Sequence, residues 1–222
     1  MQKAKAIYDL FIFDFDGTLA DSRSNIANSL NFSLQQKKLA PVAKEKIYPT
    51  IGRLALQETF LFFYPELSSD TVNALTAIYR KRLLAKSSEE IKLFPAVKKT
   101  LQKLTEKNKK LAMLTTKQEG TIIKLLESLS LLDYFDFVHG EGTSSYAKPD
   151  KKCIAFITEK IDKTISSEKI VMVGDTQIDI ATAKNAGIDS LGVAYGIDGE
   201  KKLLASGATQ IVGQLEEILQ FA

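Results

Sequence analysis

The sequence is poor in the two residue types that most often hold metals through sulfur or imidazole. It contains one cysteine, Cys153, and one histidine, His139, in 222 residues. A single cysteine excludes both an intramolecular disulfide and a zinc site built from several thiolates. Cys153 falls on an apolar helical stripe, so we expect it in the core. Without a second histidine a metal role for His139 has little support, and we expect it to be structural or solvent-facing.

Long hydrophobic runs are also missing. No apolar stretch approaches the roughly 20 residues that a membrane-spanning helix needs, so we expect no membrane partner. Residues 1–13 contain lysines followed by a short apolar run, which leads directly into Asp14 and Asp16 without a small-residue cleavage site. This pattern does not fit a secretory signal peptide. The sequence therefore predicts a cytoplasmic protein.

An excess of charge of one sign is absent as well. The formal net charge is only +3, and the lysines are scattered along the chain instead of forming one basic block. Aromatic residues do not alternate with arginines to form a stacking platform for bases. These observations argue against a nucleic-acid partner.

Short apolar runs are present, and they recur at intervals suited to strands separated by helices. They are rich in β-branched and aromatic residues and occupy residues 8–13, 111–114, 137–138, 170–173 and 190–193. Nearly continuous apolar runs of this length are typical of strands buried on both faces of a parallel sheet. Helical stripes lie between them, at residues 97–104, 122–129 and 153–161. The alternation predicts an α/β fold with a Rossmann-like, doubly wound parallel sheet.

One stretch, residues 20–91, interrupts this alternation. It shows helical patterns at residues 26–39, 54–63 and 70–84, turns near residues 49–52 and 64–69, and no convincing strand. A crossover between parallel strands typically needs only about a dozen residues. We therefore predict an inserted α-helical domain over residues 20–91 and a core domain formed by residues 1–19 and 92–222.

Polar residues follow the apolar runs where each predicted strand ends. They are Asp14 and Asp16 after the first run, Thr115 and Thr116 after the second, Lys148 in the loop after the third, and Asp175 after the fourth, with Asp179 at the start of the next helix. In open α/β sheets, ligands bind at the carboxyl ends of the strands. We therefore expect these side chains to converge at one edge of the sheet.

The convergent set suits phosphoryl chemistry. The carboxylates of Asp14 and Asp175 are oxygen ligands of the kind that Mg²⁺ prefers. A lysine and a hydroxyl can donate hydrogen bonds to phosphoryl oxygens. Of two aspartates two residues apart, such as Asp14 and Asp16, one can attack while the other moves a proton. Gly17 lets the chain turn tightly beside an anion, where backbone N–H groups add donors.

These residues carry a resemblance to the haloacid dehalogenase superfamily of phosphohydrolases. The similarity is to its phosphoglycolate phosphatase-like group, which has a helical cap, and it spans essentially the whole chain. The four matching motifs are Asp14-Phe15-Asp16-Gly17-Thr18-Leu19-Ala20-Asp21-Ser22, then Thr115, then Lys148-Pro149-Asp150, and finally Val173-Gly174-Asp175 followed by Asp179, Ala183 and Ala186-Gly187. The chain departs from the family pattern at Thr116, where asparagine is usual, and at Lys151, where a second proline is frequent.

The resemblance implies a role for each motif residue. Asp14 would be the nucleophile, and Asp16 would act first as the general acid and then as the general base. Mg²⁺ would be held by Asp14, by the backbone carbonyl of Asp16 and by Asp175. Thr115 and Lys148 would hold phosphoryl oxygens, and Thr116 either assists them or is an ordinary strand-end residue. Asp179 would support the metal-bound waters or orient Lys148.

The substrate stays open at this stage. The resemblance implies a small phosphomonoester, and phosphoglycolate, pyrophosphate, a sugar phosphate and a nucleotide monophosphate are all admissible. Arg53, in the predicted insertion, is expected to contact the non-reacting part of the substrate; the alternative is a surface arginine. We expect a monomer or a homodimer.

Other functions share parts of this pattern. A β-phosphoglucomutase-like mutase has the same four motifs but uses a histidine in the cap, and residues 20–91 contain none. A receiver domain of a signalling protein also phosphorylates an aspartate beside Mg²⁺, but it has about half this length and no cap. A catalytically silent binding protein would not need the full catalytic set. A phosphatase is therefore the preferred hypothesis.

Overall fold

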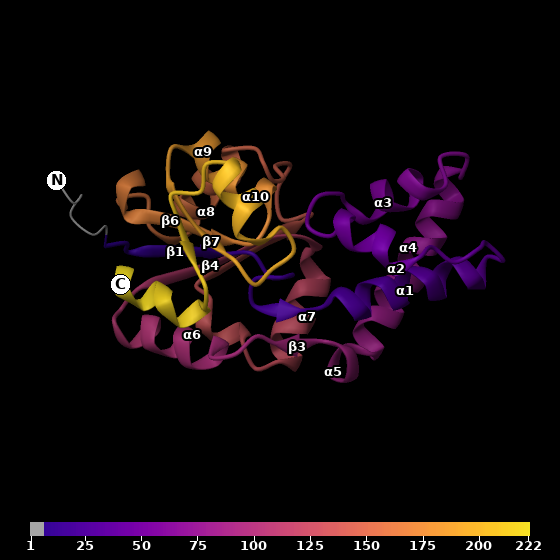
Figure 1. The fold of residues 1–222 in the computed structure, drawn as a ribbon, viewed down its shortest axis with the longest axis horizontal. Coiled ribbons are helices and arrows are strands. Elements are labelled where there is room, and N and C mark those ends of the chain that lie inside the picture. The colour runs from indigo at the N-terminus through magenta and orange to yellow at the C-terminus, as the bar shows by residue number, and fades with distance from the viewer. Residues whose placement is uncertain (1–6) are drawn as a thin grey trace.

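Six parallel strands form the central sheet of the computed structural model, which describes residues 7–222 (Figure 1). Their spatial order is β5-β4-β1-β6-β7-β8, and every neighbouring pair is parallel. The strands are β1 (Leu10–Phe13), β4 (Lys110–Gln118), β5 (Phe137–Glu141), β6 (Ile170–Gly174), β7 (Asp189–Val193) and β8 (Gln210–Val212). The predicted α/β, doubly wound class is confirmed.

The two faces of the sheet bury alternate residues of β1. Leu10 and Ile12 pack in the cluster that contains residues of α8 (Lys152–Ile161) and α9 (Gln177–Ala186). Phe11 and Phe13 belong to the opposite cluster, with α6 (Val97–Glu106), α7 (Glu119–Ser128) and the 3₁₀ helix η4 (Leu215–Phe221). Successive side chains of a strand point to opposite faces. A strand covered by helices on both faces therefore needs apolar residues at every position.

The strands agree with the predicted runs to within a few residues, except that β4 and β5 extend further than predicted. Three strands were not predicted. β8 has only three residues at the edge of the sheet, too few for a readable pattern. β2 (Ala20–Asp21) and β3 (Lys92–Leu93) form a two-residue antiparallel pair. The prediction that residues 20–91 contain no strand was wrong at their first two residues, because so short a pairing leaves no alternation in the sequence.

Helices fill the chain between β2 and β3, and we call residues 23–90 the helical segment. It comprises α1 (Arg23–Gln36), α2 (Lys44–Ile47), η1 (Tyr48–Thr50), α3 (Leu56–Phe63), α4 (Ser69–Ala85) and α5 (Ser87–Glu90). The three long helices match the predicted helical patterns, whereas the short helices α2, η1 and α5 were not predicted. Figure 1 shows the segment extending beyond one end of the sheet. Residues 1–6 of the predicted core domain lie outside the described residues.

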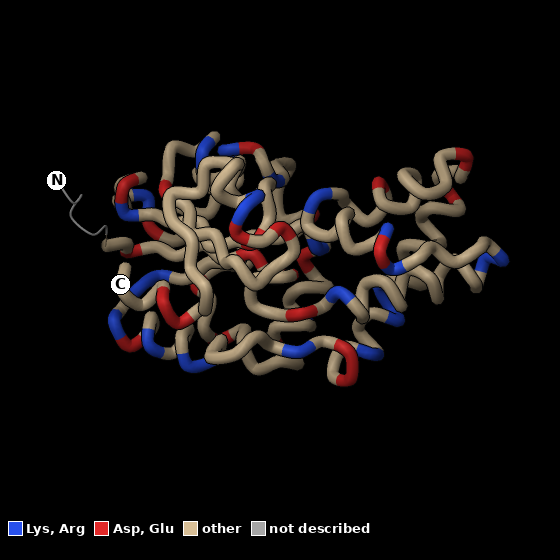
Figure 2. Tube along the Cα trace, in the orientation of Figure 1, with Lys and Arg blue, Asp and Glu red and all other residues tan. Residues whose placement is uncertain are grey.

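Charged residues are mixed along the whole described chain. Figure 2 shows Lys and Arg interspersed with Asp and Glu, as the sequence pattern predicts. Among the described residues, no helix combines the length and the apolar character that crossing a membrane requires.

The ion pair between Arg82 and Glu90 joins α4 to α5, and it yields a prediction on stability. The two side chains form two hydrogen bonds of 2.7 and 2.8 Å, and Asn25 and Asn28 of α1 also donate to Glu90. Hydrogen bonding from Arg82 holds the pKa of Glu90 below its ordinary value. The stabilisation is therefore fully present above pH 4.5, which is the ordinary pKa of a glutamate side chain. It is lost as the pH falls through the lower pKa that Glu90 has in the folded state.

We expect Glu90→Gln to lower the free energy of unfolding by about 1 kcal/mol near neutral pH. The difference from the unsubstituted protein should shrink as the pH falls through the pKa of Glu90 in the folded state. Urea unfolding of both proteins over a series of acidic pH values measures it. An unchanged difference at low pH would contradict the electrostatic origin of the effect.

Candidate active site

Three aspartates meet at the carboxyl edge of the sheet. Asp14 follows β1, Asp175 follows β6, and Asp179 lies in the first turn of α9. One carboxylate oxygen of each lies within 4.8 Å of the others, and all three residues are buried. Since β1 and β6 are parallel neighbours, their ends bring these carboxylates together, as the topology rule predicts.

Lys148 is the cation in contact with this cluster. Its Nζ lies 3.1 Å from Asp14 Oδ1 and 2.7 Å from Asp179 Oδ1, and its side chain is 1% exposed. Asp179 is fixed in turn, because its Oδ2 accepts hydrogen bonds from the backbone N–H and the hydroxyl of Thr176 at the start of α9. This is the contact expected if Asp179 orients Lys148.

The cluster carries more negative charge than Lys148 can neutralise. Burial raises the pKa of Asp14 to about 7; Lys148 opposes this rise, and Asp179 and Asp16 add to it. Burial raises the pKa of Asp175 as well, and Asp14 and Asp179 add to that rise. Oδ2 of Asp14 is buried and has no hydrogen-bond partner. A group of buried carboxylates with an unpartnered oxygen fits a divalent cation that prefers oxygen ligands.

Two glycines allow the chain to close around Asp175. Gly17 has a φ of +81°, and a Cβ there would lie 2.1 Å from Oδ2 of Asp175. A Cβ on Gly196 would come equally close to the Cβ of Asp175. The carboxylate then accepts hydrogen bonds from the Thr18 hydroxyl at 2.8 Å and from the backbone N–H of Ile197 at 2.7 Å. The loops after β1 and β7 thus hold Asp175 in one orientation.

Asp16 is not a member of this cluster and has partners of its own. Its Oδ2 lies 2.8 Å from Nζ of Lys117, and its Oδ1 accepts a hydrogen bond from the hydroxyl of Ser22. Sequence reasoning gave Lys117 no role, because β4 was predicted to end at Leu114. The strand continues to Gln118. The position of Lys117, two residues after Thr115, was the available signal, since residues i and i+2 of a strand share a face.

Thr115 and Thr116 lie where β4 passes the end of β1. Thr115 is buried, Thr116 is half-buried, and both line a pocket together with Lys148. The hydroxyl of Thr115 accepts a hydrogen bond of 3.3 Å from the backbone N–H of Lys117. The structure therefore places both hydroxyl-bearing residues beside the lysine, as the sequence predicts.

Arg53 lies at the edge of this region, but its charge has another partner. Its guanidinium donates to the carbonyl of Pro49 at 3.0 Å and forms an ion pair with Asp198. Asp198 is buried and also accepts from the backbone N–H of Gln177 at 2.8 Å. The contact joins the helical segment to the loop after β7. Contact between Arg53 and the substrate stays a prediction.

The two rare residues lie in the core. Cys153 is a fully buried residue of α8, as predicted. His139 in β5 is also buried, with Nε2 2.9 Å from the Ser144 hydroxyl. Burial lowers the pKa of His139. It has a structural position and is not solvent-facing.

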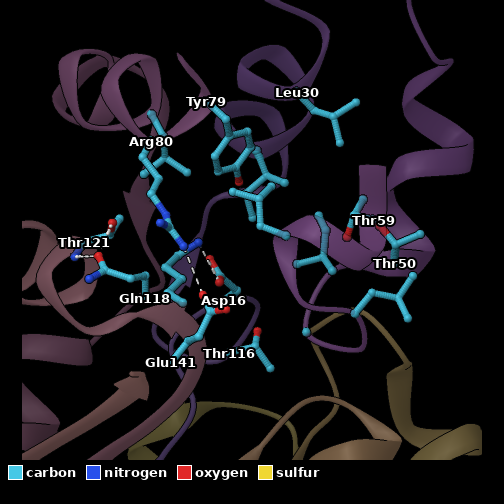
Figure 3. A pocket seen from close by; sticks show the side chains of 17 residues that line it. Asp16, Leu30, Thr50, Thr59, Tyr79, Arg80, Thr116, Gln118, Thr121 and Glu141 are labelled. Carbon is cyan, nitrogen blue, oxygen red and sulfur yellow. Dashed lines mark hydrogen bonds and ion pairs between the residues drawn. The ribbon is translucent and has the colours of Figure 1, made fainter. Parts of the chain in front are cut away.

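A pocket separates the helical segment from the sheet edge, and Asp16 lies in its wall (Figure 3). We call it the interface pocket. Its 17 lining residues include Ile26, Leu30, Ile51, Leu54, Leu56, Tyr79 and Leu83 on the apolar side and Asp16, Arg80, Lys117 and Glu141 among the polar ones. Arg80 of α4 and Glu141 of β5 form an ion pair of 3.0 Å. Sequence reasoning missed this pair, because its members lie 61 residues apart and no local pattern links them.

Comparison with known proteins adds to this geometry. The sequence profile of a family described as haloacid dehalogenase-like hydrolase matches residues 11–193. The chain belongs to this family. The match extends from the first strand to the end of β7, so it contains every residue of the aspartate cluster, and the helical segment lies inside it.

Two curated relatives and one solved structure illustrate how this hydrolase compares with others. The phosphoglycolate phosphatase of Agrobacterium fabrum is 31% identical over 87% of this chain and 83% of its own length. The pyrophosphatase PpaX of Listeria monocytogenes is 32% identical over 86% of each chain. A haloacid dehalogenase-like hydrolase from Streptococcus pneumoniae has a TM-score of 0.80 at 26% identity, over 96% of this chain and 98% of the other. The predicted family resemblance is confirmed.

Proposed function

We propose that this hydrolase is a Mg²⁺-dependent phosphatase that cleaves small phosphomonoesters through an aspartyl phosphate on Asp14. The observation that carries the proposal is the unpartnered Oδ2 of Asp14, buried beside Lys148 and two further carboxylates. An unpaired carboxylate oxygen at a sheet switch point is poised for attack on an anionic phosphorus centre. The names of the relatives support phosphoester chemistry.

In the first half-reaction a bond forms between a carboxylate oxygen of Asp14 and phosphorus while the ester P–O bond breaks. Asp16 gives its proton to the departing alkoxide. Lys148 and Thr115 hold the phosphoryl oxygens, and the charge of Lys148 reduces the repulsion between the carboxylate and the dianionic ester. Lys117 and Ser22 fix the carboxyl group of Asp16 in the wall of the interface pocket.

In the second half-reaction water attacks the aspartyl phosphate. Asp16, which lost its proton in the first step, takes one from this water. The bond between Asp14 and phosphorus breaks, inorganic phosphate leaves, and both aspartates return to their starting states. One residue can serve both steps because each step leaves it in the protonation state that the other requires.

The residues that would hold Mg²⁺ are Asp14, Asp175 and the backbone carbonyl of Asp16, with Asp179 behind them. When bound, the ion would offset the negative charge of the phosphoryl group and of the cluster. Oxygen donors alone, with an excess of negative charge, suit this ion better than zinc or copper.

We also propose that residues 20–91 act as a cap on a core of residues 1–19 and 92–222. Two ion pairs cross the boundary in the described chain, Arg53–Asp198 and Arg80–Glu141. Closing the cap excludes water during transfer, and opening it releases the products. The cytoplasmic location and the monomer or homodimer state stay predictions.

Phosphate release from a panel of phosphorylated metabolites tests the proposed function. We expect turnover of at least one small phosphomonoester with Mg²⁺ and its loss when EDTA removes the metal. Adding excess Mg²⁺ after EDTA should restore the rate, which separates metal removal from denaturation. A folded protein that releases no phosphate from any ester with Mg²⁺ would refute the proposal.

A further inference from the structure

The charged groups in the interface pocket cancel one another. Its lining among the described residues contains four charged side chains, Asp16, Arg80, Lys117 and Glu141. They form two ion pairs, Lys117–Asp16 at 2.8 Å and Arg80–Glu141 at 3.0 Å. Figure 3 shows the side chains of Arg80, Glu141 and Asp16 turned toward one another at one side of the pocket. The formal charge of the lining is therefore zero, and neither cation is free to meet an anion.

The Arg80–Glu141 pair lines the interface pocket together with Asp16, the proposed general acid, and the leaving group would extend into this pocket from Asp16. An anionic leaving group there would face the carboxylate of Glu141 and would have to displace it from Arg80. Like-charge juxtaposition in a partly desolvated pocket is costly. A neutral leaving group needs no such exchange, because both charges already have partners.

The second cation does not alter this balance. Lys117 forms an ion pair with Asp16, the proposed general acid. It therefore lies where the phosphoryl transfer would take place. When Asp16 carries the proton for transfer, Lys117 no longer has a charged partner in Asp16, and we assign its charge to the transferring phosphoryl group. The ammonium therefore serves the reacting end and is not available to the distant end of the leaving group.

Two of the three hydroxyl groups that the helical segment contributes to the described lining, those of Thr50 and Thr59, already have partners. The hydroxyl of Thr50 donates to the carbonyl of Ile47 at 2.7 Å, and that of Thr59 donates to the carbonyl of Ala55 at 3.0 Å. Both threonines line the pocket beside its apolar residues. Tyr79 contributes a hydroxyl, which Figure 3 shows directed toward the pocket. Such a wall suits carbon and hydroxyl groups better than a carboxylate.

We infer that the hydrolase selects phosphomonoesters whose leaving group is an uncharged alcohol, and discriminates against leaving groups that carry a carboxylate or a second phosphate. The inference rests on the proposed function. The inferred substrates differ from those in the names of the relatives, phosphoglycolate and pyrophosphate. The leaving groups of those two substrates, glycolate and phosphate, are both anionic. Glu141 is the residue that sets the preference, because it neutralises Arg80.

A matched pair of substrates tests the inference. Glycerol phosphate and phosphoglycerate, each esterified at the primary hydroxyl, differ by a neutral –CH₂OH against a carboxylate. We expect kcat/KM of the unsubstituted hydrolase to favour glycerol phosphate by roughly tenfold or more. If another ester of the panel turns over faster, its neutral and carboxylate forms are compared in the same way.

Two variants distinguish charge from structure. Glu141→Gln leaves the pocket with one net positive charge, and we expect the ratio to shift roughly tenfold toward phosphoglycerate. Arg80→Gln breaks the same ion pair but leaves one net negative charge, so the ratio should shift the opposite way. The double variant should return the ratio close to its original value. A pair that only closes the cap would move both single variants in the same direction.

The outcomes separate the two proposals. Mg²⁺-dependent turnover with phosphoglycerate preferred by the unsubstituted hydrolase would overturn the inference and leave the phosphatase function standing. Shifts in the same direction for Glu141→Gln and Arg80→Gln would also overturn it. The absence of Mg²⁺-dependent release from every ester of the panel would refute the phosphatase function and the inference with it.

Discussion

Replacing Asp14 with asparagine is expected to lower Mg²⁺-dependent phosphate release by roughly 10⁴-fold or more, the range found when a covalent nucleophile is removed. Asparagine has nearly the same shape but is neutral, so it is a poor nucleophile toward phosphorus and cannot form an acyl phosphate. The measurement is steady-state phosphate release, joined with acid quenching during turnover to trap the phosphorylated protein. The unsubstituted hydrolase should yield a base-labile acyl phosphate and the variant none.

We expect the Asp14→Asn variant to keep the native fold. Asp14 shares a buried cluster with two other carboxylates, and burial raises its pKa to about 7. Removing its charge relieves repulsion, so we expect the metal-free variant to be no less stable in urea unfolding. Asp133→Asn, at an exposed position in the 3₁₀ helix Leu132–Tyr134, is the matched control and should keep full activity. Turnover of Asp14→Asn near the original rate would refute the covalent mechanism.

The second large effect is expected at Lys148, on stability as well as on activity. Although its burial opposes the charged form, Asp14 and Asp179 hold the pKa of Lys148 above its ordinary value. Lys148→Met keeps the length of the side chain but leaves the buried carboxylates uncompensated. We expect the metal-free variant to lose about 3–5 kcal/mol of unfolding free energy, as found when one partner of a buried ion pair is removed.

Activity and metal dependence complete this prediction. The variant should lose roughly 10²–10³-fold in kcat/KM, because the phosphoryl oxygens lose a charged donor. Saturating Mg²⁺ should recover part of the stability by supplying positive charge to the same cluster. Lys151→Met, at an exposed position three residues away, is the control and should change neither quantity appreciably. A metal-free Lys148→Met as stable as the unsubstituted hydrolase would show that Lys148 does not compensate these carboxylates.

Local sequence pattern was enough to predict the sheet and the meeting of four side chains at its edge. The run before Asp14 is apolar at every position because both of its faces are covered by helices. Parallel strands end at the same edge, so Asp175 had to lie near Asp14. The contact of Asp179 with Lys148 is one of the two roles that the family resemblance implied for Asp179, the other being support of the metal-bound waters. The chemical roles of these residues stay predictions until the variants are measured.

The contacts between the helical segment and the rest of the chain were not predictable in the same way. Arg80 lies on a helix of the helical segment and Glu141 at the end of β5, and only the packing of the two parts brings them together. Arg53 illustrates the same limit, because its partner Asp198 lies 145 residues further along the chain. A charged side chain with no partner nearby in the sequence can have one in the folded chain, as Arg53 has in Asp198. The partner of a single arginine therefore cannot be predicted from its neighbours in the sequence.

The short pairing of β2 with β3 has a consequence for how such hydrolases diverge. Asp21 and Lys92 are direct partners in this antiparallel pair, so the chain leaves and re-enters the sheet domain at adjacent points. The strand order around Asp14 therefore does not depend on the length or shape of the helical segment that lies between β2 and β3. Under the proposed function, mutation could remodel the helical wall of the interface pocket while the aspartate cluster keeps its geometry. Substrate choice and bond-breaking chemistry could then change independently of one another.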